Sequence, residues 1–319
     1  MRILVLGGTS FVGRAIVSDA LDQGDDVTLF SRGQTGPELF GGVERRRGDR
    51  DTGDYTSLVA GSWDAVVDVS GYVPRHVAQA TQALRGSVGR YLFISTGSVY
   101  DRQQASDRIS EDSARLQPVR DTEQITEHTY GPLKVACEDD VLSAWGAAAT
   151  LVRPGIVAGP HDPSDRFTYW VRRAATGGRL AIPARLDQPV QVMDAGDLAR
   201  LTVQLLHDDR PGVYNAVGPA DPVTLAQLVL TCADAAGSSV ELVPVDPSVV
   251  EPGFPLVLPD ETWDVMFRRS RAAAEDAGLP ATPLVRTSAD VLAWDRQRDA
   301  PPLSVGLTPE RERQLLAGA

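Results

Sequence analysis

A tyrosine and a lysine four residues apart form the most informative pair in the sequence. They lie in the segment Tyr130-Gly131-Pro132-Leu133-Lys134, and Lys134 is the single lysine among the 31 basic residues. On a helix, residues at this spacing share a face. A phenol has a pKa near 10, and a neighbouring ammonium favours its ionised form. The pair could therefore exchange a proton with a substrate, and Lys134 could also donate to ribose hydroxyls more compactly than a guanidinium.

Hydroxyl side chains follow a strand that we predict over Tyr91–Ser95, where the sequence continues Thr96-Gly97-Ser98. The carboxyl ends of parallel strands face the ligand crevice of a doubly wound sheet. We therefore expect Thr96 to orient a substrate oxygen. Ser98 is a candidate for substrate contact, with bonding to loop backbone as the alternative.

A glycine-rich turn, GGTSFVG, joins a predicted strand over Arg2–Leu6 to a predicted helix over Phe11–Gln23. Ser10 replaces the middle glycine of the usual pattern, and a turn of this kind can be merely glycine-rich. Its place between strand and helix favours a pyrophosphate site, because the helix N-terminus offers free N–H groups. The expected contacts are Gly7, Thr9, Ser10, Phe11, Val12 and Gly13.

The end of the second predicted strand, Asp26–Phe30, distinguishes NAD from NADP. An acid at this place binds ribose hydroxyls, whereas an arginine accommodates the 2′-phosphate. The chain has Ser31 and Arg32 there, so we expect NADP(H) to be preferred, with NAD(H) as the alternative; Arg32 could instead be a solvated loop residue. We expect Asp49 beside the adenine and Arg50 to add positive charge toward the phosphate.

The first half of the sequence alternates strand and helix patterns, which indicates a parallel sheet with helices on both faces. Further strands are predicted over Val43–Arg47, at a sheet edge, and over Ala65–Val69 and Thr150–Arg153. Helices are predicted over Pro74–Leu84 and Tyr130–Trp145. The expected class is an α/β Rossmann-type doubly wound parallel sheet with a smaller C-terminal substrate lobe.

Proline and glycine become frequent after Pro154, and the regular alternation of elements is lost. A helix over Asp194–His207 and a strand over Gly212–Val217 are predicted to return to the sheet. We therefore expect a dinucleotide-binding domain at 1–155, with a return of roughly 188–218. The substrate-binding lobe is expected to comprise 156–187 and 219–319.

Acidic residues outnumber basic ones 43 to 31, which gives a net charge of −12. Phosphate backbones and anionic membranes repel such a chain, so we expect a small-molecule substrate and neither nucleic acid nor membrane as partner. No apolar run approaches the ~20 residues that span a bilayer, and no signal peptide is expected before Arg2. Two cysteines and four histidines without ligand spacing predict no metal site and a reduced, cytoplasmic protein.

Several segments occur together in a characteristic order over residues 1–160: GGTSFVG, LFSRG, GDR, FISTGSVY, YGPLK and RPGIVAGP. With VQVMDAGDLA and GVYNAVG, they resemble the extended short-chain dehydrogenase/reductase superfamily in its NAD-dependent epimerase/dehydratase branch. The resemblance implies a catalytic triad of Thr96, Tyr130 and Lys134. It also implies cofactor contacts from Val69, Ser70, Lys134, Pro154, Ile156 and Val157.

Many members of this superfamily form dimers through the two helices that correspond to Pro74–Leu84 and Tyr130–Trp145, so a homodimer or a monomer is expected. Sugar-nucleotide dehydratases of the family carry an Asp-Glu pair where this chain has Gly97 and Ser98, so dehydration is not expected. With Ser10 and Arg32 at these motif positions, the chain resembles atypical members of the family, including chloroplast stem-loop RNA-binding relatives. The retained Tyr130 and Lys134 and the negative charge argue against a purely RNA-binding role.

The sequence offers further candidate substrate contacts. Arg166 and Trp170 are four residues apart and could share a helix face toward a nucleotide, sugar or carboxylate, or could simply pack the lobe. Gln191 lies where the chain returns toward the crevice. His128 precedes Tyr130 by two residues and could reach substrate, or be incidental.

These patterns lead to a principal hypothesis and two alternatives. The principal one is an NADP(H)-dependent oxidoreductase on a small or sugar-like substrate, in which Thr96 binds the carbonyl oxygen and Tyr130 donates the proton. The second is an NAD(P)-dependent sugar-nucleotide epimerase that uses the same triad for transient oxidation. The third is a protein that binds or senses NADP without turnover.

Overall fold

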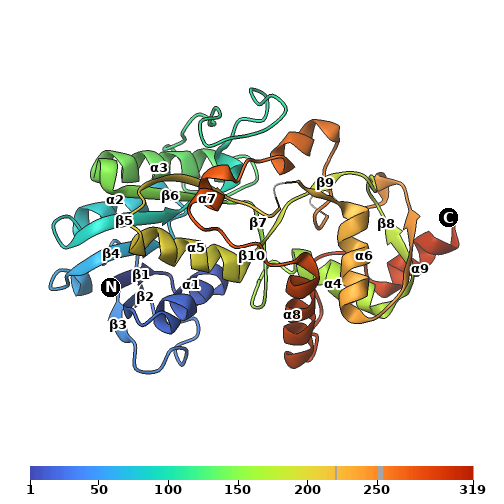
Figure 1. Ribbon diagram of the computed structural model, residues 1–319, viewed down its shortest axis with the longest axis horizontal. Helices are drawn as coiled ribbons and strands as arrows, with labels where there is room; N and C mark the ends of the chain where they lie inside the picture. The colour runs from blue at the N-terminus through green and yellow to red at the C-terminus, as the bar shows by residue number, and fades with distance from the viewer. Residues whose placement is uncertain (220, 251–253, 319) are drawn as a thin grey trace. The chain divides into compact units, whose positions relative to one another are not determined.

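The computed structural model describes residues 1–219, 221–250 and 254–318, which form two compact units. The first unit comprises Met1–Gly155, Ala195–Val217 and Arg269–Pro280. The second comprises Ile156–Asp194, Gly218–Arg268 and Ala281–Ala319. Figure 1 labels the elements of both units.

A seven-stranded sheet with the order β11-β6-β5-β4-β1-β2-β3 forms the centre of the first unit. All its pairings are parallel, and β3 lies at one edge, as its polar sequence predicts. The central strands are buried on both faces, which explains their continuous apolar sequences. The strands are β1 (Arg2–Leu6), β2 (Asp26–Ser31), β3 (Glu44–Arg47), β4 (Trp63–Asp68), β5 (Val88–Ile94), β6 (Ala149–Pro154) and β11 (Gly212–Ala216).

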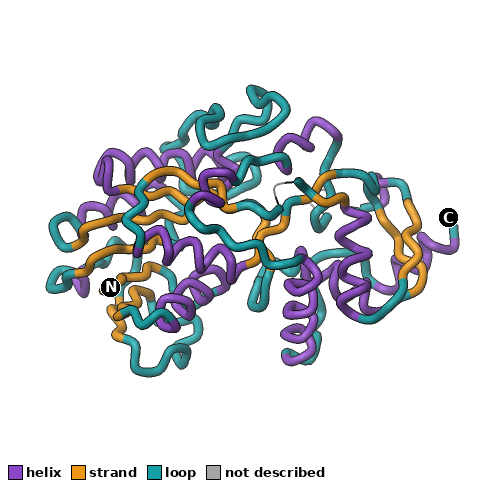
Figure 2. Tube along the Cα trace, viewed as in Figure 1, coloured by secondary structure: helices purple, strands orange, loops and turns teal. Residues whose placement is uncertain are grey.

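Helices cover both faces of this sheet, as Figures 1 and 2 show. On one face α1 (Phe11–Asp22) packs against α5 (Ala195–His207). On the other, α2 (Pro74–Ala83) packs against α3 (Tyr130–Trp145). The predicted Rossmann-type α/β fold is confirmed.

The return of the chain to the first unit differs from the prediction. It begins at Ala195, later than the expected position near residue 188, and a further segment, Arg269–Pro280, belongs to the same unit. This segment contains α7 (Ala272–Asp276), which packs against β11. It joins the unit through a parallel bridge between Ile109 and Arg269, a long-range pairing that has no local sequence signal.

The second unit is built from helices around small sheets. Its core includes Trp170, which is fully buried and donates its indole N–H to the carbonyl of Pro255 at 2.9 Å. The paired strands are β7 (Ile156–Ala158) with β10 (Val192–Asp194), β9 (Pro189–Val190) with β12 (Val223–Thr224), and β8 (Gly178–Ile182) with β13 (Val240–Pro244). The helices are α4 (Arg166–Thr176), α6 (Leu225–Ala236), α8 (Leu284–Gln297) and α9 (Pro309–Ala317).

None of the helices in the described residues combines the length and the apolar character that crossing a membrane requires.

Candidate active site

The turn between β1 and α1 has the close packing that a dinucleotide site needs. Gly7 has a φ of +93°, and a Cβ added to it would lie 2.8 Å from the Cβ of Ser70. A Cβ on Gly13 would lie 2.1 Å from the carbonyl oxygen of Gly7. Glycine at both positions therefore lets the main chain of the turn, the first turn of α1 and the end of β4 approach one another.

The N-terminus of α1 offers groups that suit a pyrophosphate. Ser10 precedes the helix in an extended conformation, is exposed, and makes no side-chain capping bond to the described residues. The N–H groups of the first helical turn carry partial positive charge. Thus the structure brings together Gly7, Thr9, Ser10, Phe11, Val12, Gly13 and, through Gly7, Ser70. These features fit a nicotinamide dinucleotide at this edge of the sheet.

Arg50 binds a buried carboxylate, which corrects our expectation that it adds positive charge toward a phosphate. Its guanidinium forms a bidentate ion pair with the fully buried Asp68, at 2.6 and 2.9 Å. It also donates to the hydroxyl of Ser70 at 2.9 Å and to the carbonyl of His76 at 3.0 Å. Burial opposes ionisation of Asp68, but Arg50 outweighs it and holds the pKa of this carboxyl below its usual value. Arg50 is therefore a structural cation behind the cofactor edge.

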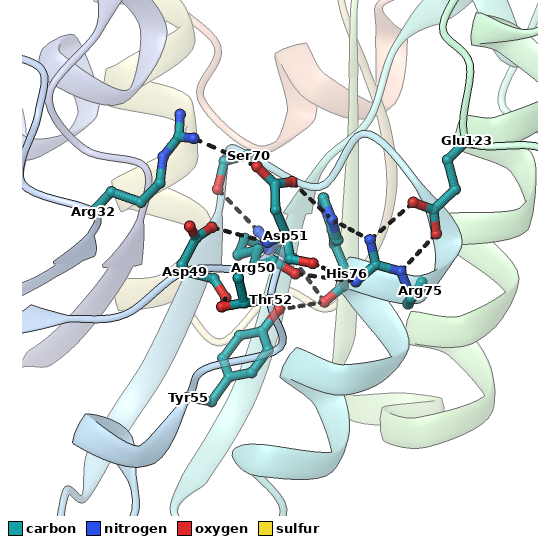
Figure 3. Close-up of polar contacts among 10 residues, drawn as sticks. All are labelled: Arg32, Asp49, Arg50, Asp51, Thr52, Tyr55, Ser70, Arg75, His76 and Glu123. Carbon is teal, nitrogen blue, oxygen red and sulfur yellow. Dashed lines mark hydrogen bonds and ion pairs between the residues drawn. The ribbon is translucent and has the colours of Figure 1, made fainter.

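A row of exposed and half-buried charges runs from Arg32 to Glu123 (Figure 3). Asp51 lies 3.4 Å from Arg32 and 3.3 Å from His76. Arg75 donates to both carboxylate oxygens of Glu123, at 2.6 and 2.8 Å, and to the carbonyl of Asp51 at 3.1 Å. Arg75 thereby connects the loop after β3 with the loop that precedes α3.

Two candidate residues for the adenosine end keep their expected places. Ser31 ends β2, and its hydroxyl accepts a bond from the N–H of Gly33 at 3.2 Å. Asp49 follows β3, where its main chain pairs with that of Asp54. Their predicted contacts with ribose and adenine remain predictions.

A second glycine brings the start of α3 to the turn after β5. A Cβ on Gly131 would lie 2.3 Å from the carbonyl oxygen of Ser98. Thr96 follows β5 by two residues, and its hydroxyl accepts a bond from the N–H of Ser98 at 3.2 Å. Because Tyr130 begins α3, this close approach places it in the neighbourhood of Thr96. Glycine at position 131 is a sequence signal for this contact that spacing alone does not reveal.

Lys134 lies one helical turn after Tyr130 and is 2% exposed. Its ammonium donates to the carbonyl oxygens of Gly71 and Ile94, both at 2.8 Å, and lies 4.0 Å from the ring centroid of Phe93. Burial lowers the pKa of Lys134 to about 8. Lys134 thus fastens α3 to the loops after β4 and β5; its predicted contacts with ribose and tyrosine remain predictions.

A buried network holds α3 from the other side. Arg153, near the end of β6, donates to both carboxylate oxygens of Glu138 on α3, at 2.8 and 2.7 Å. It also donates to the hydroxyl of Tyr100 at 2.9 Å and to the carbonyl of Glu111 at 3.0 Å. Arg153 and Lys134 together fix the helix that begins with Tyr130.

The structure places the candidate substrate residues in different environments. Trp170 is a core residue, so the prediction of a shared ligand-binding face with the exposed Arg166 is wrong. Gln191 is buried, and its side-chain amide donates to the carbonyl of Pro219 at 3.1 Å, which is a structural contact. His128 is exposed and lies 3.3 Å from Glu127. Ser98 is exposed beside Thr96.

The remaining predicted cofactor contacts lie in or next to strands. Val69 follows β4, and Pro154 ends β6 in the first unit. Ile156 and Val157 belong to β7 of the second unit. In the described part of the chain, His, Cys, Asp and Glu form no group of three that could hold a metal ion.

Arg269 lies beside the predicted site, and the sequence analysis did not identify it. Its guanidinium lies against Gly97, since a Cβ there would be 2.4 Å from Cζ of Arg269. The two residues are far apart in sequence, and no local pattern marks position 269.

Comparison with known proteins agrees with this geometry. Residues 65–216 match the model of the NAD dependent epimerase/dehydratase family. The predicted resemblance to this family is confirmed. The predicted enzyme class, NAD(P)-dependent and of the short-chain dehydrogenase/reductase type, is supported by the same match, and so is a nicotinamide cofactor.

One curated relative extends the sequence comparison. The chloroplast stem-loop binding protein of 41 kDa b from Arabidopsis thaliana is 25% identical over 253 residues. The matched residues are 74% of this chain and 63% of that protein, so the chain spans less than two thirds of its relative.

Solved structures of epimerases share the fold. UDP-glucose 4-epimerase of Thermotoga maritima, solved with UDP-glucose, has a TM-score of 0.70 at 18% identity, over 93% of this chain and 99% of that one. UDP-glucuronic acid 4-epimerase of Bacillus cereus, in complex with NAD, has a TM-score of 0.70 at 16% identity, over 94% and 98% of the two chains.

The substitution Gly13→Ala tests the packing of the glycine turn. The added Cβ would contact main-chain atoms that cannot move independently, so we expect a loss of about 1–3 kcal/mol in the free energy of unfolding. We also expect weaker dinucleotide binding. Gly41→Ala is the matched control, because a Cβ there meets nothing within 4 Å. Denaturant unfolding that gives the two variants equal stability would contradict the packing argument.

The substitution Arg50→Met tests the buried ion pair. It leaves the carboxylate of Asp68 buried without its cation, so we expect a loss of about 3–5 kcal/mol in the free energy of unfolding. The double variant Arg50→Met/Asp68→Leu should recover much of this loss, since neither charge remains. Urea denaturation measures both effects; a double variant that is less stable than Arg50→Met would oppose a purely ionic cause.

Proposed function

We propose that the protein is an NADP(H)-dependent oxidoreductase that acts on a small or sugar-like substrate at a carbon bearing oxygen. The observation that supports NADP(H) most directly is Arg32, which stands after β2 where NAD-dependent folds carry an acid. Its ion pair with Asp51 joins side chains that are 53% and 64% exposed. Such pairs contribute only about 0–1 kcal/mol, so a 2′-phosphate can replace the carboxylate at little cost.

The chemistry would take place at the carboxyl ends of β5 and β6. When bound, NADPH supplies the hydride. The hydroxyl of Thr96 would donate to the substrate oxygen, and Tyr130 would give that oxygen a proton. Lys134 would favour the resulting phenolate through its positive charge, since it lies one turn away on the same helix.

Epimerisation of a sugar nucleotide is the second candidate. It is favoured by the shared fold with UDP-sugar epimerases, including one in complex with NAD. In that reaction Tyr130 would first remove and then return the proton, with no net turnover of cofactor. Nicotinamide that stays bound through gel filtration, together with isomerised sugar and no net oxidation, would favour this candidate.

The partner and location follow from charge and cysteine chemistry. A net charge of −12 favours a small-molecule substrate over nucleic acid, although the curated relative is a stem-loop binding protein. Cys137 and Cys232 are both free and buried, which suits a reducing compartment such as the cytoplasm. Either a monomer or a homodimer is compatible with the proposed reaction.

Cofactor titration tests the proposed preference. We expect NADPH to bind at least about tenfold more tightly than NADH, because a charged bond between Arg32 and the 2′-phosphate contributes about 1.5–3 kcal/mol. Arg32→Asp should reverse this order. Fluorescence titration with both cofactors measures the affinities.

The matched control is Arg85→Asp, the same charge change at an exposed position beyond the far end of α2. It should leave the preference unchanged. Tighter binding of NADH by the parent protein would overturn the NADP(H) assignment.

The pH dependence of turnover tests the role of Lys134. Its pKa of about 8 means that the ammonium is lost as pH rises through this value. We therefore expect kcat/KM for carbonyl reduction to fall above pH about 8, where the cation no longer favours the phenolate. A rate that stays constant to pH 10 would exclude the ammonium as the required form.

Tyr130→Phe separates catalysis from binding. The variant should bind NADPH with unchanged affinity and lose at least about 100-fold in turnover, since positioned acids contribute about 10²–10⁴-fold. If a cellular activity of the protein survives this change intact, the non-catalytic binding or sensing role gains support.

A further inference from the structure

The main chain of Arg269 is anchored because it pairs with another segment of the chain. It forms a parallel bridge with Ile109, and the N–H of the next residue, Ser270, donates to the carbonyl of Ile109 at 2.7 Å. Ile109 is fully buried in the loop that runs between β5 and α3. The backbone at 269 is therefore anchored to the loop that leads to Tyr130, although it lies about half the chain away in sequence.

The guanidinium of Arg269 lies against the main chain at the carboxyl ends of two neighbouring strands. A Cβ on Gly97 would be 2.4 Å from both Cζ and Nη1, and a Cβ on Gly155 would be 3.2 Å from Nη1. Gly97 follows Thr96 after β5, and Gly155 follows β6, its neighbour in the sheet. Because Gly97 and Gly155 have no side chains, the guanidinium of Arg269 has space beside Thr96.

The charge of Arg269 has a less favourable environment than that of a nearby buried arginine. Arg153 has Glu138 at 2.7 Å, and this carboxylate outweighs burial and raises the pKa of Arg153. For Arg269, which is 7% exposed, burial lowers the pKa to about 10, and the phenol of Tyr100 only partly opposes this effect. An anion delivered to Arg269 would offset part of the desolvation.

We propose that Arg269 is a substrate-binding residue that holds a carboxylate next to the carbon that is oxidised or reduced. The proposal rests on the proposed function, because Thr96 and Tyr130 define where that carbon lies. A planar guanidinium binds a carboxylate through two parallel N–H···O bonds, which fixes orientation as well as position. The substrate class is then a hydroxy acid or oxo acid, or a sugar acid with its carboxylate beside the reacting carbon.

The position explains why the residue after Thr96 is glycine. A side chain at 97 would occupy the volume of the guanidinium, and an acid there would form an ion pair with it. Glycine at position 97 therefore leaves the space that the guanidinium of Arg269 occupies, and the two residues have to be considered together.

Binding of oxalate to the NADPH-saturated, full-length protein tests the proposal without knowledge of the substrate. We expect oxalate to bind, and its uncharged isostere oxamide to bind at least about tenfold more weakly, because a hydrogen bond to a charged group exceeds a neutral one. In Arg269→Met the affinity for oxalate should fall at least about tenfold, with Arg269→Lys between the two. Fluorescence of the bound NADPH reports both titrations.

Arg268→Met is the matched control, since Arg268 is the adjacent residue and its side chain is 51% exposed. It should leave the oxalate affinity unchanged. Gly97→Ala provides a second variant: its Cβ contacts the flexible end of the Arg269 side chain, so the guanidinium should shift and oxalate should bind more weakly without unfolding.

Two results would overturn the proposal: no binding of oxalate by the parent protein, or equal oxalate affinity in the parent, Arg269→Met and Gly97→Ala. Inorganic phosphate is titrated in parallel, and a preference for phosphate over oxalate would also count against a carboxylate. The NADPH affinity of each variant separates the hypotheses. If NADPH does not bind the parent, the proposed function fails, whereas loss of oxalate binding alone affects only the role of Arg269.

Discussion

The buried ammonium of Lys134 is the charge on which the arrangement of the site depends. It is 2% exposed and donates to main-chain carbonyls after β4 and at the end of β5, so it joins α3 to two strand ends. Burial lowers its pKa from 10.5 to about 8, so the unfolded chain binds this proton more tightly than the folded one. The protonated lysine therefore lowers stability below pH 8, and this penalty disappears as pH rises toward 10.5. Buried groups with shifted pKa values of this kind are concentrated at functional sites.

Two other buried charges at this edge, Asp68 and Glu138, are compensated by arginines and act as supports. Asp68 receives two bonds from Arg50 and a third from the hydroxyl of Tyr91 at 2.7 Å. Glu138 receives two bonds from Arg153 and a third from Arg115, at 2.9 Å. Each pair joins elements that are distant in sequence, and removal of either partner would leave a buried charge. The supports therefore make the strand ends rigid, as an orienting site requires.

The sequence predicts most of the fold and only part of the site, for physical reasons. Parallel strands buried on both faces have continuous apolar sequences, so β1 and β2 were located closely. Tyr130 and Lys134 belong to one helix and have a local spacing. By contrast, the partner of Arg50 lies 18 residues away and that of Trp170 lies 85 away. Such pairings, and the contact of Arg269 with Gly97, depend on tertiary structure that no window of sequence contains.

Local and global charge have opposite signs in this protein, and the difference bears on its ligands. The whole chain carries a net charge of −12, which repels extended polyanions. Yet the carboxyl edge of the sheet has Arg32 exposed near one end and Arg269 buried beside Thr96. An edge that is cationic at these two points, in a chain that is acidic overall, favours a small anion that fits between protein groups. A dinucleotide with a 2′-phosphate and a carboxylate substrate meet this requirement, whereas a nucleic acid backbone does not.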